Sequence, residues 1–582
     1  MKNIFKKAFS LILALALVSG ALTSAAASGA DFRDLHPMDE EHLSEIAAQA
    51  EELADLFSRV FDVEIRMVTL TEEAMAIALS DFEYLANKIL QTAPTLNILY
   101  RRLGVNAELF FAVYHQIIYN NIPLPSIIAL DMGERWADIP DEARYIAADY
   151  LYILLTMMSW ELQGLGHMGV QPLVLIEQVF FGQAYRLQAG ADTVVLDPDD
   201  IDRILDLGFA EQDIERAIRA AMRFAELHVE IFNTPSVLWF YGIDPDEFDF
   251  DVDISEVMGF RDEDNITTDI LEPGSIAYIR IASFMNNIAL DSETLFPFYE
   301  QIRDYDHLII DIRGNSGGWS TSFPLNVLSK LIDEEISFKY AEFFIDSELT
   351  ADFFEMPMGL AGGMLYGIFP ARQFVRDQDM PYFNPDDLDM LDYAIVWEVR
   401  LIPREDNIPF GGKIWLLVDG GSASASEMAA QISISTGFAT VVGQPTAGIS
   451  GVIYTYAALP QTGMLFRIDL GYTVDQYGRS FEEFGVIPHV LNAGGLDALE
   501  TVLLMIALSE IPVKYVDGEA FVPLRMTAYA HGWAVRWDDE NWAVHGSNDA
   551  GETWTVIVYD AGGFIAEGKS WIPHELAEQL FG

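Results

Sequence analysis

One continuous stretch, residues 411–448, constrains the fold of this chain more than any other. It contains an apolar run at 414–418 that predicts a buried strand, and the run breaks at a glycine turn at 419–421. A helix is predicted from there to about Ser435, followed by a second buried strand at 439–442. Strand, turn, helix and strand in close succession predict a mixed α/β domain.

Ser424 stands at the start of that predicted helix, three residues before Glu427. One interpretation is structural: Ser-x-x-Glu is a capping box, in which two side chains satisfy exposed N–H groups of the first turn. The other is chemical: a serine that projects from a strand-to-helix turn can act as a nucleophile, because N–H groups at a helix start favour developing negative charge. Taken alone, the stretch leaves both interpretations open.

A second stretch, residues 308–318, also runs from an apolar strand into a loop and reads Leu-Ile-Ile-Asp-Ile-Arg-Gly-Asn-Ser-Gly-Gly. The paired glycines, Gly317 and Gly318, lack side chains, so their backbone amides can approach a bound group closely. Such a loop is a candidate oxyanion hole for a serine located elsewhere in the chain.

In this order and spacing, the two stretches resemble the S41 serine peptidases, the family of C-terminal processing (tail-specific) proteases and tricorn core proteases. Residues 310–318 resemble the family's Asp-Leu-Arg-x-Asn-x-Gly-Gly loop. Residues 422–427, with 441–448 after them, resemble its nucleophile helix and the strand that follows. The resemblance covers roughly residues 273–507.

The resemblance implies a crotonase/ClpP-like α/β core in which Ser424 is the nucleophile and the N–H groups of Gly317 and Ala425 hold the oxyanion. Processing members of the family use a neutral lysine as the base, directly after a Thr-x-Gly segment. That position is Ile449 here. Because isoleucine cannot accept a proton, the usual Ser–Lys dyad is absent.

Family members of the tricorn type carry a histidine base after an N-terminal helix, and the segment around His167 resembles it, with Gly166 where the family often has serine. Residues 478–488 resemble the family's Glu-x-x-Gly-[Val/Ile]-x-Pro element, with His489 in place of the usual aspartate. The resemblance implies that Glu482 orients the base. A structural turn histidine and an exposed loop glutamate are the alternatives.

The predicted fold class is multidomain α/β. Three lysines, an apolar run and small residues at the start are typical of a signal peptide, with a retained anchor as the alternative. Residues 518–525 and 532–538 resemble the copper-amine-oxidase-like stalk modules of extracellular bacterial proteins, and the resemblance implies no copper site. The predicted parts are a signal peptide at 1–29, an α-helical N-terminal domain at 30–243, an acidic linker at 244–272, an S41 core at 273–509 and a small C-terminal α+β module at 510–582.

The net charge of −57, from 90 acidic and 33 basic residues, argues against nucleic acid and anionic membranes as partners. The absence of cysteine excludes disulfides, a cysteine nucleophile and cysteine-bound metals. The acidic run at 244–253 lacks the register of an EF-hand, which favours a solvated linker over a calcium site. No cofactor is expected. A stretch rich in Phe, Met and Tyr at 338–399 is interpreted as an insertion that lines a cleft or forms a lid.

Two functions remain open. The first is a secreted serine peptidase that acts on peptides or unfolded proteins through Ser424, with His167 as base and Glu482 as its partner. The second is an inactive S41-type fold kept as an extracellular peptide- or wall-binding protein, in which Ser424 is only a cap. The setting expected for either is outside a bacterial cell, of Gram-positive type, with cell-wall association through the C-terminal module.

Overall fold

The computed structural model describes residues 31–35, 38–128, 141–162, 165–171, 231–242, 263–351, 364–449, 453–509 and most of 514–581. The chain divides into two compact units, the first made of Met1–Ala439 with Pro445–Ile487 and the second of Thr440–Gln444 with Pro488–Gly582. The predicted signal peptide and most of the predicted acidic linker lie outside the described residues.

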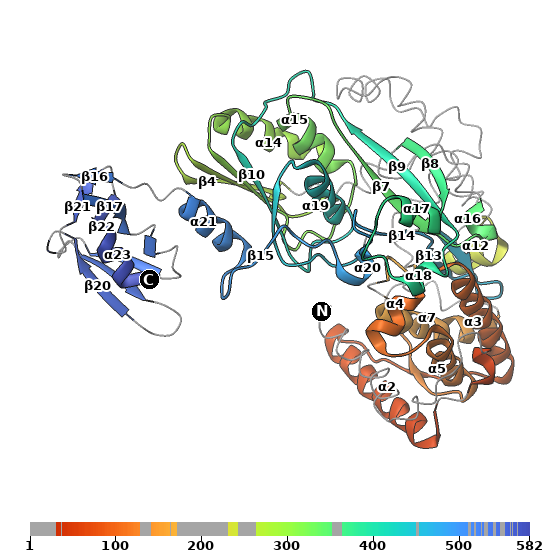
Figure 1. Ribbon diagram of the computed structural model, residues 1–582. Helices are drawn as coiled ribbons and strands as arrows, with labels where there is room; N and C mark the ends of the chain where they lie inside the picture. The colour runs from red at the N-terminus through yellow and green to blue at the C-terminus, as the bar shows by residue number, and fades with distance from the viewer. Residues whose placement is uncertain are drawn as a thin grey trace. The chain divides into compact units, whose positions relative to one another are not determined.

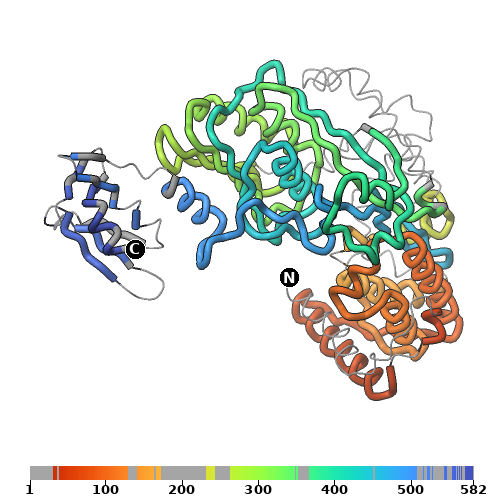
Figure 2. Tube along the Cα trace, in the orientation of Figure 1, coloured from red at the N-terminus to blue at the C-terminus, as the bar shows by residue number. Residues whose placement is uncertain are grey.

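The first unit begins with helices, as the sequence predicts, and Figures 1 and 2 show α3, α5 and α7 side by side. Side chains of Asp39, Thr71 and Asn106 cap three of the helices by accepting main-chain N–H groups. Within the described residues, no helix is long and apolar enough to cross a membrane. The helices are α2 (Glu40–Phe61), α3 (Glu72–Thr92), α4 (Leu96–Leu103), α5 (Ala107–Tyr119), α7 (Glu142–Leu162) and α12 (Pro235–Tyr241), with a 3₁₀ turn η2 (Phe32–Asp34) before them and a short β1–β2 pair (Met67–Val68, Leu124–Pro125) among them.

A mainly parallel sheet holds the two stretches that the sequence singles out. Its strands in the first unit follow the order β10-β6-β5-β4, in which β4 is antiparallel to β5 and the other neighbours are parallel. The strands β6 and β10 are apolar and buried along nearly all of their length. The elements are β4 (Ile266–Glu272), β5 (Ile276–Ile281), α14 (Ile288–Ile302), β6 (His307–Asp311), a π turn η5 (Pro324–Leu328), α15 (Ser329–Leu331), β10 (Lys413–Val418) and α19 (Ala425–Thr436).

The parallel register of β6 and β10 positions the functional loops. Leu417 pairs with Asp311, so the two strands end at the same edge of the sheet. The glycine loop follows β6 and the Ser424 turn follows β10, and both therefore begin at that edge. This is the place where parallel sheets commonly carry their ligands.

A second, antiparallel sheet is formed by the region interpreted from sequence as an insertion. Its order is β14-β7-β9-β8, and the described residues of 338–399 are mostly strands and short helices packed on them. The elements are β7 (Ile336–Phe344), α16 (Glu348–Ala351), β8 (Met364–Pro370), α17 (Ala371–Asp377), α18 (Pro385–Leu388), β9 (Tyr393–Leu401) and β14 (Tyr472–Thr473).

A third sheet joins the helical region to the end of the first unit. Apolar runs at 452–456 and 464–470, on either side of turn residues at 460–463, predict a hairpin. The structure confirms it as β12 (Tyr454–Ala458) and β13 (Leu465–Asp469). A short strand after α7, β3 (Gly169–Val170), adds to β13 in antiparallel register. The helix α20 (Phe481–Phe484) follows this sheet.

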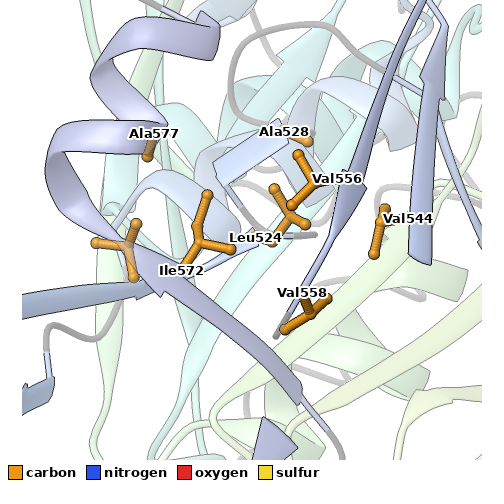
Figure 3. Packing of buried hydrophobic residues seen from close by; sticks show 8 residues of the cluster. Leu524, Ala528, Val544, Val556, Val558, Ile572 and Ala577 are labelled. Carbon is orange, nitrogen blue, oxygen red and sulfur yellow. The ribbon is translucent and has the colours of Figure 1, made fainter. Parts of the chain in front are cut away.

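The second unit starts with a parallel pair, β11 (Thr440–Gly443) and β15 (Val490–Leu491), and the helix α21 (Ala498–Ser509). The C-terminal part contains two antiparallel sheets and a helix, as predicted for an α+β module. Figure 3 shows Leu524, Val544, Val556 and Ile572 meeting in its apolar core. The elements are β16 (Lys514–Val516), β17 (Glu519–Pro523), β18 (Ala534–Asp538), β19 (Ala543–Ser547), β20 (Thr553–Ile557), β21 (Phe564–Ala566), β22 (Lys569–Pro573) and α23 (His574–Phe581).

Candidate active site

Ser424 lies in a strained turn between β10 and α19. Its backbone has φ 54° and ψ −116°, a conformation that residues with a side chain rarely adopt. Such strain costs on the order of 1–3 kcal/mol and persists only where the surroundings impose it. A serine in this kind of strand-to-helix turn projects its hydroxyl outward, as in a nucleophile elbow.

The serines on either side of Ser424 have structural hydrogen bonds. Ser422 Oγ donates to the carbonyl oxygen of Ile312 at 2.9 Å, and Ser426 Oγ donates to that of Asn315 at 2.9 Å. The half-buried Ser424 hydroxyl, by contrast, donates to no group in the described part of the chain. It is the serine whose hydroxyl is left for chemistry.

Glu427 caps the helix and also holds the segment that follows β11. Its buried carboxylate accepts the Ser424 N–H at 3.1 Å, the Thr446 hydroxyl at 2.6 Å, and the N–H groups of Gly448 and Ile449 at 2.9 and 2.8 Å. Burial raises the pKa of Glu427, and these four hydrogen bonds oppose that rise. The capping box predicted from the sequence captures only the first of the four contacts.

The two interpretations of Ser424 are therefore compatible. The Glu427 N–H donates to the main-chain carbonyl oxygen of Ser424 at 2.9 Å, so the serine hydroxyl is at most a second acceptor for it. The Ser424 N–H also contacts the carbonyl oxygen of Ile449 at 3.1 Å. Position 449 thus lies beside the serine, where the family resemblance implies a base, and it carries an aliphatic side chain.

The glycine loop packs directly against Ser424. A β-carbon on Gly317, which has φ +97°, would lie 2.8 Å from Ser424 Cβ and 2.6 Å from the Ala423 carbonyl oxygen. The Ala423 N–H donates to the Asn315 carbonyl oxygen at 3.0 Å, which ties the two loops together. Only glycine permits this approach, and the side chain of any other residue would separate the loop from the serine.

The prediction that the Gly317 N–H holds an oxyanion needs correction. That N–H donates to Asn315 Oδ1 at 2.9 Å, because the asparagine side chain folds back along its own loop. Within the described residues, the N–H groups of Gly318 and Ala425 have no hydrogen-bond acceptor. Ala425 is the first residue of α19, where a main-chain N–H has no partner in its own helix.

His167 lies in the turn between α7 and β3 and contacts Asp469, not Glu482. Its main-chain N–H donates to Asp469 Oδ2, and its ring Nδ1 is 3.6 Å from the same oxygen. The side chain of His167 is 26% exposed, whereas that of Asp469 is buried. His167 makes no hydrogen bond to Ser424 in this arrangement, both residues being among those described.

Glu482 is buried on α20 and accepts the Ser480 hydroxyl at 3.0 Å. The alternative of an exposed loop glutamate is therefore wrong. Glu482 makes no hydrogen bond to His167 or Ser424, all three of which lie in the described part of the chain. His489 has a structural contact: its Nδ1 accepts the Val441 N–H at 3.1 Å, and burial lowers its pKa.

No group of three or more His, Asp or Glu side chains is placed to hold a metal ion in the described residues. What the site brings together is a serine in a strained turn, a glycine loop against it and two N–H groups that have no acceptor among the described residues. A nucleophile and oxyanion donors of this kind, together with a base, are what serine attack on a carbonyl needs.

Residues 275–491 match the model of the peptidase family S41. The chain contains an S41 peptidase domain. Similar solved structures include the photosystem II D1 C-terminal processing protease, at 18% identity and TM-score 0.25 over 39% of this chain and 48% of that one. Mature CPAF complexed with lactacystin follows at 17% identity and TM-score 0.26, over 39% and 49%. The tricorn protease has 16% identity and TM-score 0.20, over 38% and 15%.

The S41 domain accounts for part of the sequence only. The chain spans about half or less of the length of these three proteins. The matched residues 275–491 lie inside the predicted core of 273–509, and they include Ser424, the glycine loop and Glu482 but not His167. The proposed base thus comes from the helical region before the S41 domain.

Proposed function

We propose that this protein is a serine peptidase that hydrolyses peptides or unfolded proteins by attack of Ser424. The observation that carries the proposal is the contact of the glycine loop with a serine held at positive φ, whose hydroxyl donates to no described group. The S41 peptidase domain supports the same reaction class. Peptides and proteins are the substrates that this class implies.

In the proposed mechanism, Ser424 Oγ attacks the scissile carbonyl carbon while His167 takes the hydroxyl proton. The N–H groups of Gly318 and Ala425 stabilise the oxyanion that develops. His167 then gives its proton to the leaving amine, and water releases the acyl group from Ser424 by the reverse steps. The absence of a direct Ser424–His167 hydrogen bond is compatible with this mechanism, because catalytic contacts often tighten only with substrate bound.

Two features favour the second candidate function, a peptide-binding protein without catalysis. Ile449 replaces the base of the processing proteases, and His167 makes no hydrogen bond to the serine in this arrangement, both residues being described. Secretion from a bacterial cell, and wall association through the C-terminal module, remain proposals under either function. They are supported by the composition of residues 1–29 and by the resemblance of the module.

Hydrolysis of unfolded casein by the full chain tests the proposal. We expect Ser424→Ala to lose at least about a thousandfold in kcat, because removal of the nucleophile leaves only binding and the oxyanion site. Ser426→Ala is the matched control: it loses one buried hydrogen bond, worth about 1 kcal/mol, and keeps its activity. Unchanged hydrolysis by Ser424→Ala would exclude this serine. Binding of peptide by a folded wild type that hydrolyses nothing would favour the second function.

A further inference from the structure

Strand pairing brings Asp469 to His167 from a distant part of the sequence. In the antiparallel pair β3–β13, Val170 lies opposite Phe466 and Gly169 lies opposite Arg467. Continued by two residues, the same register sets position 167 opposite position 469. The pairing therefore fixes which carboxylate faces the histidine, and it does so through the backbone of both segments.

The two oxygens of Asp469 contact different partners. Oδ1 accepts a hydrogen bond from Arg467 Nε at 3.0 Å. Oδ2 accepts the main-chain N–H of His167 and lies 3.6 Å from ring Nδ1. That Nδ1 is buried and has no hydrogen-bond partner within the described residues. Asp469 Oδ2 therefore lies within ion-pair distance of Nδ1 and can face a proton carried there.

A buried carboxylate is costly unless a positive group compensates it. Burial acts to raise the pKa of Asp469, but Arg467 and His167 outweigh it and hold that pKa below its ordinary value. Arg467 is itself kept in place by stacking on the Tyr454 ring, 3.6 Å from the ring centroid. Asp469 is therefore an anion beside the histidine.

Gly166 makes room for this contact. A β-carbon at that position would lie 2.2 Å from Asp469 Oδ2, and the backbone has φ +113°. The glycine that departs from the family's serine at this place is thus explained by the approach of Asp469. Gly166, where the family often has serine, and Asp469 beside His167 therefore occur together because the glycine leaves the space that the carboxylate fills.

We propose that Asp469 is the positioning residue of the catalytic base, the role that the family resemblance gives to Glu482. Asp469 holds the ring so that Nδ1 carries its proton toward Oδ2 and Nε2 is left to accept the proton of Ser424. When that proton moves to Nε2, Asp469 stabilises the imidazolium and remains ionised itself. The inference rests on the proposed function, in which His167 is the base.

Steady-state hydrolysis of peptide by Asp469→Asn tests the proposal on the full chain. We expect kcat to fall by about 10²–10⁴-fold, the contribution of a correctly held base, with KM changed by less than about threefold. In a His167→Ala background, Asp469→Asn should cause no further loss, because residues that act as one unit are not additive. A merely structural aspartate would lower activity in both backgrounds.

Asp81→Asn provides a matched control. Asp81 is also fully buried in the first unit, and it accepts the N–H groups of Gln461 and Thr462 and the Thr462 hydroxyl. We expect this variant to lower the melting temperature without a selective fall in kcat. If Asp469→Asn does not fold, Asp469→Glu keeps the negative charge and moves the carboxylate relative to the ring, and the proposal still requires a fall in kcat.

The outcomes separate this inference from the function on which it rests. Full activity of His167→Ala would remove the proposed base, and the role of Asp469 with it. A second outcome would overturn the Asp469 proposal alone. In it, His167→Ala loses activity, but Asp469→Asn, or Asp469→Glu in its place, keeps a kcat within about threefold of wild type. A further tenfold loss or more from Asp469→Asn in the His167→Ala background would also overturn it, since Asp469 would then act elsewhere.

Discussion

Gly166 and Asp469 are in closer contact than any side chain at position 166 would allow, because a β-carbon there would lie 2.2 Å from Asp469 Oδ2. Gly166→Ala should therefore displace Asp469 and lower both activity and stability. Gly104→Ala is the control, since Gly104 also has positive φ but open space around it. The control should cost about 1–2 kcal/mol for the backbone alone, measured by thermal unfolding, and keep its activity. Equal losses of activity and stability in Gly166→Ala and Gly104→Ala would contradict the contact.

The glycine loop gives a second matched pair of variants. In Gly317→Ala the new methyl group would lie 2.8 Å from Ser424 Cβ, whereas a β-carbon added at Gly314 would meet nothing within 4 Å. We expect Gly317→Ala to lose at least about a hundredfold in kcat, because the loop with its oxyanion donor, the Gly318 N–H, must move away from the serine. Gly314→Ala should lose stability but little kcat. Retained kcat in folded Gly317→Ala would show that the loop has no part in catalysis.

Ile449 offers a test of which base the site can use. Its N–H is bound by Glu427 and its carbonyl oxygen by Ser424, so the backbone is fixed beside the nucleophile. We expect Ile449→Lys, introduced into His167→Ala, to raise the rate about tenfold above that of His167→Ala alone. This gain is well below the 10²–10⁴-fold contributed by a positioned base. The rate of peptide hydrolysis in the double variant measures this. No recovery would show that position 449 does not reach the serine proton.

How far the sequence predicts this site depends on how local each part is. Ser424 and the glycine loop follow from two short patterns, each a strand that runs into a turn, and the structure brings both to one sheet edge. Such short patterns do not predict the role of Asp469, because its position beside His167 is set by the register of two strands far apart in the chain. An aspartate at the end of a predicted hairpin strand, after an arginine two residues earlier, is the one local signal.

The fold shows the same division. Apolar spacing predicts helices at 39–61 and 141–161, and the structure confirms them at 40–61 and 142–162. The hairpin predicted around 460–463 is confirmed at 454–469. The sheet formed by most of 338–399 was not predicted, because its strands pair mainly with one another across long connections. The engagement of the Gly317 N–H depends on the rotamer of Asn315, which no sequence pattern specifies.

Acid should weaken the contribution of Asp469 to stability. Burial acts to raise its pKa, but Arg467 and His167 hold the pKa below its ordinary value. A carboxyl group whose pKa is lower in the folded chain stabilises it above the unfolded pKa, near 3.9, and loses that contribution as the pH falls through the folded value. The difference in free energy of unfolding between wild type and Asp469→Asn, from urea titrations, should therefore be largest at neutral pH and should shrink as the pH falls below that unfolded value. A difference independent of pH would contradict this assignment.

Labelling with a fluorophosphonate probe at neutral pH, with the modified residue mapped by mass spectrometry, tests the central claim most directly. The full chain would be compared with Ser424→Ala and His167→Ala. We expect a label on Ser424 in the wild type and no label on the corresponding peptide of Ser424→Ala. In His167→Ala, we expect Ser424 to be labelled about a hundredfold or more slowly. A label on another residue, or labelling of Ser424 at the wild-type rate without His167, would contradict the central claim.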